Sequence, residues 1–143
     1  DRDTDQTEDV QKQSFDFTGK TFLLADDNEL NREIAYELLS EQGLIVDAVE
    51  NGREALELLR QQPENFYELI FMDIQMPVMD GYDAAARIRR MKDEKKASIP
   101  IIAMTANAFA EDRQKAISMG MNDHVAKPID MNVLLPVIAK YIR

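Results

Sequence analysis

Five polar side chains that could do chemistry stand directly after short apolar runs of the kind that form buried β-strands. Asp73 is the clearest case, because it ends the apolar run 69–72 and Pro77 follows where a strand cannot continue. In an open parallel sheet, the carboxyl ends of the strands lie at one edge, where binding sites form. The candidate site residues are Asp26, Asp27, Asp73, Thr105 and Lys127.

This combination of side chains favours phosphoryl transfer to a carboxylate. Three carboxylates a few ångströms apart repel one another strongly unless a cation neutralises them. Mg²⁺ prefers oxygen ligands and takes one or two carboxylates together with water and phosphate oxygens. Lys127 would add a fixed positive charge and Thr105 a hydroxyl donor, which suits a reaction that needs positioning and charge neutralisation. We therefore predict Asp73 as the nucleophile, provided that the strand order brings these residues together.

Each of these residues also has a simpler explanation when it is taken alone. Asp73 fits a solvated turn residue, and Asp26-Asp27 fits an acidic pair that favours the dipole of a following helix. Thr105 fits a β-branched strand residue and Lys127 an ordinary surface lysine. Their recurrence at the ends of four predicted strands favours one shared site over several coincidences.

The composition excludes several classes of protein. The 143 residues are enough for one domain with a sizeable core, and 45% of them are hydrophobic, which indicates a globular fold. A net charge of -10 argues against a nucleic-acid-binding surface, and the lack of cysteine excludes disulfides and thiolate metal sites. No apolar run approaches membrane-spanning length and no signal peptide is recognisable. We expect a cytoplasmic location, either of a free protein or of the cytoplasmic part of a membrane-bound kinase.

Apolar runs alternate with helical periodicities along the chain. This pattern predicts an α/β fold with a doubly wound, five-stranded parallel sheet and five helices on its two faces. Strands are expected at 21–25, 44–49, 69–73, 99–104 and 123–126, and helices at 29–42, around 55–59, at 82–91, at 109–119 and around 133–141.

Three local expectations follow from this pattern. In the first helix, Leu30, Ile34 and Leu38 share one face at helical spacing and are expected to be buried, with Leu39 beside them. Residues 92–98 are expected to form a charged loop. Pro136 is expected early in the last helix, where its missing N–H costs least.

The N-terminal segment differs in character from the rest of the chain. Residues 1–18 are polar and acidic, so they are predicted to form a flexible linker or tail, and residues 19–143 the folded domain. Gly19-Lys20-Thr21 resembles the end of a phosphate-binding loop. That motif must follow a strand and open a helix, whereas this triplet precedes a strand, so we reject it.

Taken together, these motifs resemble a known family, the CheY-like receiver domain of two-component response regulators. The resemblance rests on the acidic pair at Asp26, on Asp-x-x-Met-Pro-x-Met-Asp-Gly from Asp73, on Thr105-Ala106 and on Lys127-Pro128 in this order. It covers about residues 20–143. It implies the flavodoxin-like strand order 2-1-3-4-5, which would bring the predicted site together.

The resemblance implies a chemical role for Asp73 and a metal site around it. Asp73 would accept a phosphoryl group from the phosphohistidine of a histidine kinase or histidine phosphotransfer domain, and the domain would also catalyse its own dephosphorylation. Asp27 and Asp73 would bind Mg²⁺, or Mn²⁺ in its place, and Asp26 would hold it mostly through water. The backbone carbonyl of Gln75 would complete the protein ligands.

The resemblance also implies which residues bind and sense the phosphoryl group. Lys127 and Thr105 would each contact a phosphoryl oxygen, the small Ala106 would leave the site open, and the Lys127-Pro128 bond would be cis. Gln75 and Asn107 would flank the group and influence its lifetime.

Phosphorylation would then draw Thr105 inward and His124 after it, which shifts the face formed by the fourth helix, fifth strand and last helix. The family more often has Tyr or Phe at the position of His124, so this residue adds a group that titrates near neutrality. Read without the family, His124 is a partly buried strand residue.

The amino-acid sequences of three motifs most resemble those of receivers fused to hybrid sensor histidine kinases. The motifs in question begin at Asp27, Met104 and Met121. The lack of an initiator Met and the acidic lead-in favour an excised receiver over a free-standing regulator. We expect the domain to be a monomer or a weak dimer. A second hypothesis is a phosphoaspartyl phosphatase of the haloacid-dehalogenase type. That family needs Asp-x-Asp after the first strand, where this chain has Asp26-Asp27-Asn28, so we discount it. A pseudo-receiver that serves only for interaction is the remaining alternative.

Overall fold

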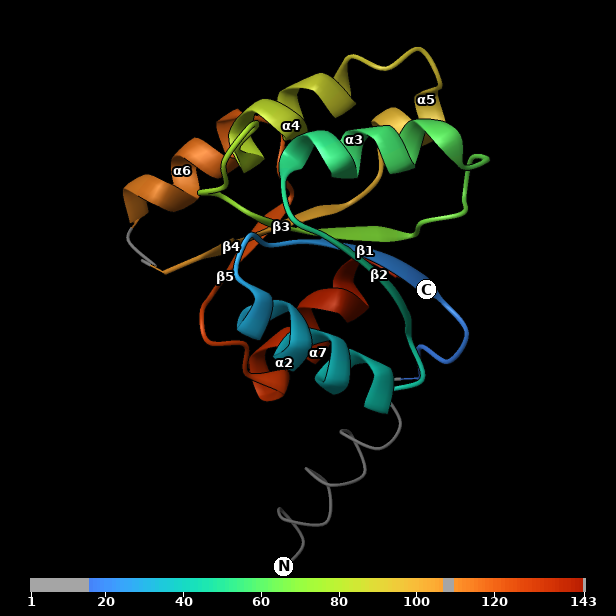
Figure 1. Ribbon diagram of the computed structural model, residues 1–143, viewed down its shortest axis with the longest axis vertical. Helices are drawn as coiled ribbons and strands as arrows, with labels where there is room; N and C mark the ends of the chain where they lie inside the picture. The colour runs from blue at the N-terminus through green and yellow to red at the C-terminus, as the bar shows by residue number, and fades with distance from the viewer. Residues whose placement is uncertain (1–15, 107–109, 143) are drawn as a thin grey trace, which may run out of the picture.

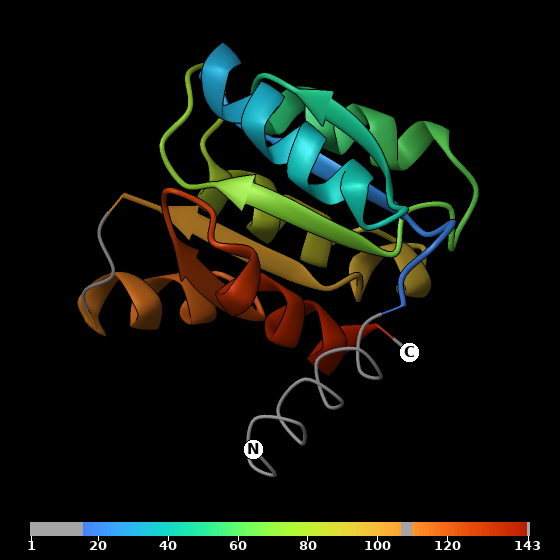
Figure 2. The same ribbon diagram turned by 90° about the horizontal axis from the view of Figure 1, so that it is seen from below.

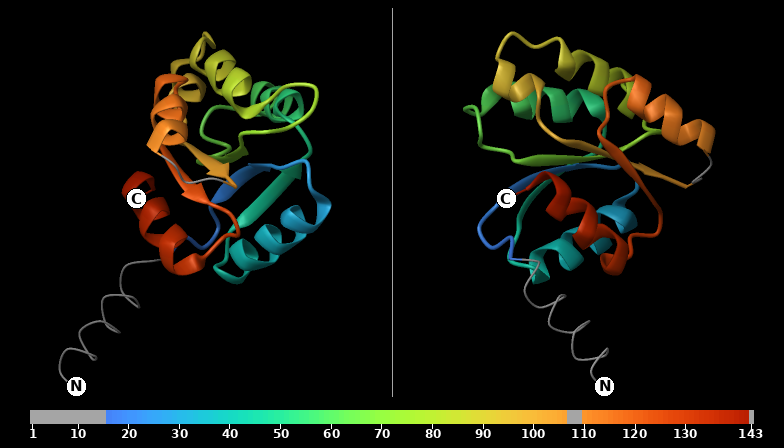
Figure 3. Two further views of the ribbon diagram at one scale, coloured as in Figure 1. Left: turned by 90° about the vertical axis from the view of Figure 1, so that its left-hand side faces the viewer. Right: turned by 180° about the vertical axis from the view of Figure 1, so that it is seen from behind.

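The computed structural model describes residues 16–106 and 110–142, which form a parallel five-stranded sheet between two layers of helices (Figure 1). The strand order is β2-β1-β3-β4-β5, which is the predicted order 2-1-3-4-5. Helices α3, α4, α5 and α6 cover one face, and α2 and α7 cover the other (Figures 1 and 3). The elements are β1 (Thr21–Ala25), α2 (Glu29–Glu41), β2 (Ile45–Val49), α3 (Gly52–Gln61), β3 (Leu69–Asp73), α4 (Gly81–Arg89), α5 (Glu94–Ala97), β4 (Ile101–Thr105), α6 (Ala110–Ser118), β5 (Asp123–Ala126) and α7 (Met131–Tyr141).

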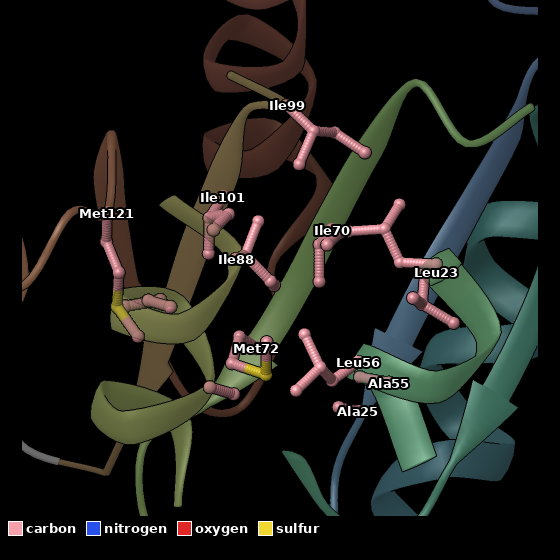
Figure 4. Packing of buried hydrophobic residues seen from close by; sticks show 14 of the residues in the cluster. Leu23, Ala25, Ala55, Leu56, Ile70, Met72, Ile88, Ile99, Ile101 and Met121 are labelled. Carbon is pink, nitrogen blue, oxygen red and sulfur yellow. The ribbon is translucent and has the colours of Figure 1, made fainter. Parts of the chain in front are cut away.

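Two hydrophobic clusters hold the layers together, one on each face of the sheet. Successive residues of a strand point to opposite faces, so Leu23 packs on the α3–α4 side and Leu24 on the α2–α7 side. Figure 4 shows the first cluster, in which Ile70 and Met72 of β3 face Leu56 of α3. Every residue of β3 and β4 is buried, as expected for central strands covered on both faces.

Side-chain caps begin most of the helices. The side chain of Asn28 accepts a hydrogen bond from the backbone N–H of Asn31 at 3.0 Å, and Asp80 accepts from Asp83 in the same way at 2.8 Å. Gly43 follows the end of α2 with φ at 84°, a conformation that favours glycine, so the predicted stop of this helix is confirmed.

The predicted buried face of α2 was wrong for Leu30 and Ile34, whereas the predicted burial of Leu39 is confirmed. Leu30 and Ile34 are 62% and 44% exposed, whereas Ala35 and Leu39 are 1% and 0% exposed. Both sets have i, i+4 spacing, so the periodicity is compatible with either, offset by one residue. The small Ala35 allows the helix to approach the sheet closely, which turns Leu30 and Ile34 toward solvent. Figure 2 shows α2 and α7 lying over this face of the sheet.

Two further expectations need correction. Residues 94–97 form α5, a single helical turn within the predicted loop, because the carboxylate of Asp93 accepts from the N–H groups of Lys95 (3.0 Å) and Lys96 (3.3 Å). The described part of the chain therefore has six helices, not five. Pro136 lies inside α7 and not in its first turn, because the helix begins at Met131.

The chain packs against the sheet before residue 19. Phe17 is 4% exposed and belongs to the hydrophobic cluster under α2 and α7. The predicted tail ends at residue 18, so a core residue lies between its residues Asp16 and Thr18. The rest of the tail, residues 1–15, lies outside the described part of the chain, and the division at residue 18 stays a prediction. Within the described residues, no helix has both the length and the hydropathy to span a membrane.

The loop after β3 contains a strained residue. Val78 has φ at 68°, in the left-handed region that β-branched residues avoid, and its side chain is 75% exposed. Asn tolerates this conformation, so Val78→Asn should raise the free energy of unfolding by about 1 kcal/mol. Denaturant unfolding of the two proteins measures the difference. Val133→Asn, at an exposed valine within α7, is the control and should give no gain; an equal gain there, or none at Val78, would contradict the strain.

Candidate functional site

The register of the sheet places the predicted site residues at one edge. In three of the four pairs of neighbouring strands, Ala25 lies opposite Met72, Asp73 opposite Met104, and Thr105 opposite Ala126. Asp26 directly follows Ala25, and Lys127 directly follows Ala126. The backbone N–H of Lys127 donates to the carbonyl of Thr105 at 2.8 Å, which continues the pairing into the site.

Gly81 allows the loop after Asp73 to fold back under the site. Its backbone N–H donates to the carbonyl of Ile74 at 2.9 Å, which closes the loop and begins α4. A Cβ atom at this position would collide with the backbone oxygen of Asp73 and lie 3.0 Å from Cγ of Met72. A residue without a side chain is therefore needed here.

Three carboxylates converge at this edge of the sheet. One oxygen from each of Asp26, Asp27 and Asp73 lies within 4.8 Å of the other two, close enough to hold one metal ion. Asp26 and Asp73 are 2% and 4% exposed, whereas Asp27 is open to solvent. This acidic cluster has the oxygen donors that hard divalent cations prefer.

Lys127 bridges the two buried carboxylates. Its Nζ atom lies 2.9 Å from Oδ2 of Asp73 and 3.2 Å from Oδ2 of Asp26. The other oxygen of Asp26 accepts a hydrogen bond from the backbone N–H of Asn28 at 2.9 Å, and its carbonyl accepts from Arg32 at 2.8 Å. Asp26 is thus fixed on both sides. The peptide bond between Lys127 and Pro128 is cis, as the family resemblance implied.

Negative charge is only partly compensated in this cluster. Burial raises the pKa of Asp73, and the charges of Asp26 and Asp27 raise it further, although the hydrogen bond and charge of Lys127 oppose the change. For Lys127, burial works to lower the pKa, but Asp73 and Asp26 outweigh it and the pKa is raised. A further cation at the cluster would stabilise the ionised form of Asp73.

The raised pKa makes a pH-dependent contribution to stability in metal-free buffer. The neutral form of Asp73 is favoured by the fold, so its contribution to the free energy of unfolding is greatest below the unfolded pKa of about 3.9 and is lost as pH rises through the raised folded-state pKa. Asp73→Asn should therefore become more stable than the wild type as pH rises from about 4 to 7. Urea unfolding at several pH values measures this difference, and a difference that shrinks with pH would contradict it.

An open cavity of about 930 Å³ lies above the acidic cluster. Its lining includes Asp27, Asp73, Gln75, Thr105, Ala106 and Lys127 from the predicted set. His124 does not line this cavity, because it is buried in β5 at 9% exposure. The Nε2 atom of its ring has no hydrogen-bond partner among the described residues. Asn107 lies outside the described part of the chain.

The cavity has lining residues that the sequence did not indicate. Lys115 of α6 and Tyr82 of α4 both reach it, and Nζ of Lys115 lies 4.6 Å from the centre of the Tyr82 ring. Asn28 and Asn31 line it from the start of α2. In the sequence, nothing distinguishes Lys115 from other basic residues of a polar helix. Only the packing of α6 beside α4 shows that it reaches the cavity.

Comparison with known families decides the classification of the chain. The family model described as the response regulator receiver domain matches residues 22–139. The chain belongs to this family. The strand order and the acidic cluster described above agree with the family assignment, so the resemblance inferred from the motifs is confirmed.

The relatives of this receiver domain are much longer proteins. A protein named hybrid signal transduction histidine kinase L, from Dictyostelium discoideum, is 43% identical over 122 residues, which cover 83% of this chain and 7% of that protein. The sensor histidine kinase GacS of Pseudomonas protegens is 37% identical over 120 residues, which cover 83% of this chain and 13% of GacS. The chain is thus homologous to the receiver domains of hybrid kinases.

Solved structures of receiver domains share this fold. The receiver domain of a sensor histidine kinase from Pseudomonas aeruginosa, with a magnesium ion in its active-site cleft, is 35% identical and has a TM-score of 0.77, with 87% of this chain and 98% of that chain covered. A receiver domain from Saccharomyces cerevisiae, solved with its histidine phosphotransfer protein, is 29% identical with a TM-score of 0.76, covering 87% and 90% of the two chains.

Proposed function

We propose that this receiver domain accepts a phosphoryl group from a phosphohistidine onto Asp73 in a Mg²⁺-dependent reaction. The observation that carries the proposal is the position of Asp73. It lies within an acidic cluster at an open cavity, with Nζ of Lys127 at 2.9 Å from its carboxylate. Few other functions need a nucleophilic carboxylate, further carboxylates and a fixed cation in one place.

The residues present fit a hard divalent cation. Asp27 and Asp73 would bind Mg²⁺ directly, Asp26 mostly through water, and the backbone carbonyl of Gln75 would be a further ligand; Mn²⁺ would suit the same oxygen donors. The related receiver from Pseudomonas aeruginosa, which was solved with magnesium, supports this choice. The ion would neutralise charge on the carboxylates and on the phosphoryl group.

The reaction is a displacement at phosphorus. A carboxylate oxygen of Asp73 attacks the phosphorus atom, an O–P bond forms, and the P–N bond to the donor imidazole breaks with its electron pair left on nitrogen. Lys127 and Thr105 hold phosphoryl oxygens, and the small Ala106 leaves room for them. Attack of water on the same phosphorus later breaks the O–P bond to Asp73, releases inorganic phosphate, and leaves the electron pair on the carboxylate.

The donor would be a histidine kinase or a histidine phosphotransfer domain. The related yeast receiver solved with its histidine phosphotransfer protein supports this partner. Two exposed apolar residues, Leu30 (62%) and Val78 (75%), directly adjoin the lining residues Asn31 and Pro77 in the chain, and their side chains would offer a surface for docking. The parent protein would be a hybrid sensor histidine kinase with this domain in the cytoplasm, as a monomer or weak dimer.

The output would come from the face formed by α6, β5 and α7. Thr105 ends β4 at the site, and His124 lies on the neighbouring strand β5, so a shift of Thr105 toward the phosphoryl group would open space for the His124 ring. The Nε2 atom of this ring has no hydrogen-bond partner in the described part of the chain, which indicates an environment that a small rearrangement could improve.

Acetyl phosphate provides the test, because it replaces the protein donor with a small molecule. Incubation with acetyl phosphate and Mg²⁺ should add the mass of one phosphoryl group to the chain, and a parallel sample in EDTA should remain unmodified. Intact-protein mass spectrometry measures both. No adduct with Mg²⁺ would contradict the proposal and favour a pseudo-receiver, and an equal adduct in EDTA would contradict the Mg²⁺ dependence.

A further inference from the structure

A second hollow, lined mainly by basic residues, lies on the α3–α4–α5 side of the molecule. Its volume is about 550 Å³, and no residue of its lining also lines the cavity above the acidic cluster. In a chain of net charge -10 with 17 basic residues, such a concentration of positive charge is unexpected. The lining comprises Arg60, Arg87, Arg90, Lys92 and Lys96, together with Met91 and Asp93.

The ends of three helices bring these cations together. Arg60 lies in the last turn of α3, Arg87 in the last turn of α4, and Lys96 in α5. Basic residues near helix C-termini interact favourably with the helix dipole, which accounts for each residue in its own helix. It does not account for their convergence, because like charges that face one hollow repel one another.

Little of this positive charge is neutralised by the protein itself. Among the described residues, Arg60, Arg90 and Lys92 form no ion pair. Nζ of Lys96 donates to the backbone carbonyl of Arg60 at 3.0 Å. The carboxylate of Asp93, the acidic member of the lining, accepts two backbone N–H groups at the start of α5.

A smaller hollow adjoins the first one at the loop that follows Asp73. Its volume is about 360 Å³, it shares Arg60 and Arg87 with the first hollow, and its other lining residues are Arg53, Leu56, Glu57, Val78 and Met79. Arg87 also pairs with Asp83 at 3.2 Å, and Arg53 with Glu57 at 3.2 Å, but these pairs are exposed and contribute little. The first hollow alone is lined mainly by basic residues, and it is called the basic groove below.

We propose that this basic groove binds a small polyphosphate, either inorganic or as the phosphate chain of a nucleotide. Guanidinium groups bind phosphate oxygens through paired, charge-assisted hydrogen bonds, and several of them within one hollow suit a compact ligand with several charges. A volume of about 550 Å³ lies in the range of small-molecule sites. An extended acidic peptide spreads its charges over a greater length and matches the clustered cations less well.

Isothermal titration calorimetry with tripolyphosphate in metal-free buffer tests the proposal. We expect one site per chain, with binding that weakens about tenfold as salt rises from about 50 to 200 mM. The double variant Arg60→Gln and Arg90→Gln should bind at least about tenfold more weakly. The matched control, Lys20→Gln with Lys140→Gln, removes the same charge at surface ion pairs elsewhere and should bind within about twofold of wild type.

Three outcomes would overturn the proposal: no binding at millimolar tripolyphosphate, equal weakening in both double variants, or tighter binding of a hexaglutamate peptide than of tripolyphosphate. Parallel titrations with ATP identify the source of the phosphate chain. Tighter binding of ATP assigns the groove to nucleotides, and equal binding assigns it to inorganic polyphosphate. Acetyl phosphate should label both double variants at the wild-type rate, so failure at the groove is distinguishable from failure at Asp73.

Discussion

Asp73→Asn is expected to lower the rate of phosphorylation by acetyl phosphate at least about 10³-fold. An amide at this position cannot serve as the nucleophile, and the other two carboxylates of the acidic cluster are held differently. Asp26 is bound by Lys127 and by the N–H of Asn28, and Asp27 lies toward solvent. Neither is expected to replace Asp73 at the bottom of the cavity.

The rate is measured by mass spectrometry over time at saturating Mg²⁺. Asp83→Asn provides the control, because Asp83 lies on the exposed side of α4 outside the cavity lining and pairs with Arg87. This variant should react at the wild-type rate. Labelling of the Asp73→Asn protein at more than about a tenth of the wild-type rate would move the acceptor to another residue.

Lys127→Ala is expected to slow phosphorylation about 10²-fold while Mg²⁺ binding is retained. The variant loses the cation that lies 2.9 Å from Asp73 and 3.2 Å from Asp26, so a transferred phosphoryl group lacks its fixed positive partner. The three oxygen ligands of the acidic cluster remain, and removal of the competing ammonium group favours the metal ion. In metal-free buffer, the buried carboxylates lose compensation and the free energy of unfolding should fall by about 1–3 kcal/mol.

Calorimetric titration with Mg²⁺ and labelling kinetics separate these two effects. Lys115→Ala is the matched control, because Lys115 lines the same cavity and lies over the ring of Tyr82, and among the described residues it forms no ion pair with a carboxylate of the acidic cluster. It should retain most of the labelling rate. A Lys127→Ala protein that fails to bind Mg²⁺, or that reacts as fast as wild type, would show that the role of Lys127 is assigned wrongly.

Sequence reasoning located the strands and their ends because each strand is a short apolar run closed by a polar residue. The run before Asp73 is buried throughout, and the stop at Gly43 requires a positive φ that glycine adopts readily. The order of the strands in the sheet could not be predicted in the same way. Nothing in the runs themselves dictates which strands are neighbours, so the order came from the family resemblance and was then confirmed.

The errors arose where packing between elements decides the outcome. The periodicity of α2 is satisfied by Leu30 and Ile34 as well as by Ala35 and Leu39, and only the close approach of the helix to the sheet selects the second pair. The single turn of α5 depends on the cap at Asp93, a local interaction that a count of charged residues hides. The same limit applies to Lys115 and to the basic groove, which combine residues from separate helices.

The most direct test of the account is to locate the phosphoryl group on the chain. After reaction with acetyl phosphate and Mg²⁺, borohydride reduces an aspartyl phosphate to homoserine, and peptide mass spectrometry identifies the converted residue. We expect homoserine at position 73 alone, in an amount that depends on Mg²⁺. Homoserine at another position, or none from a chain that carries the phosphoryl mass, would contradict it.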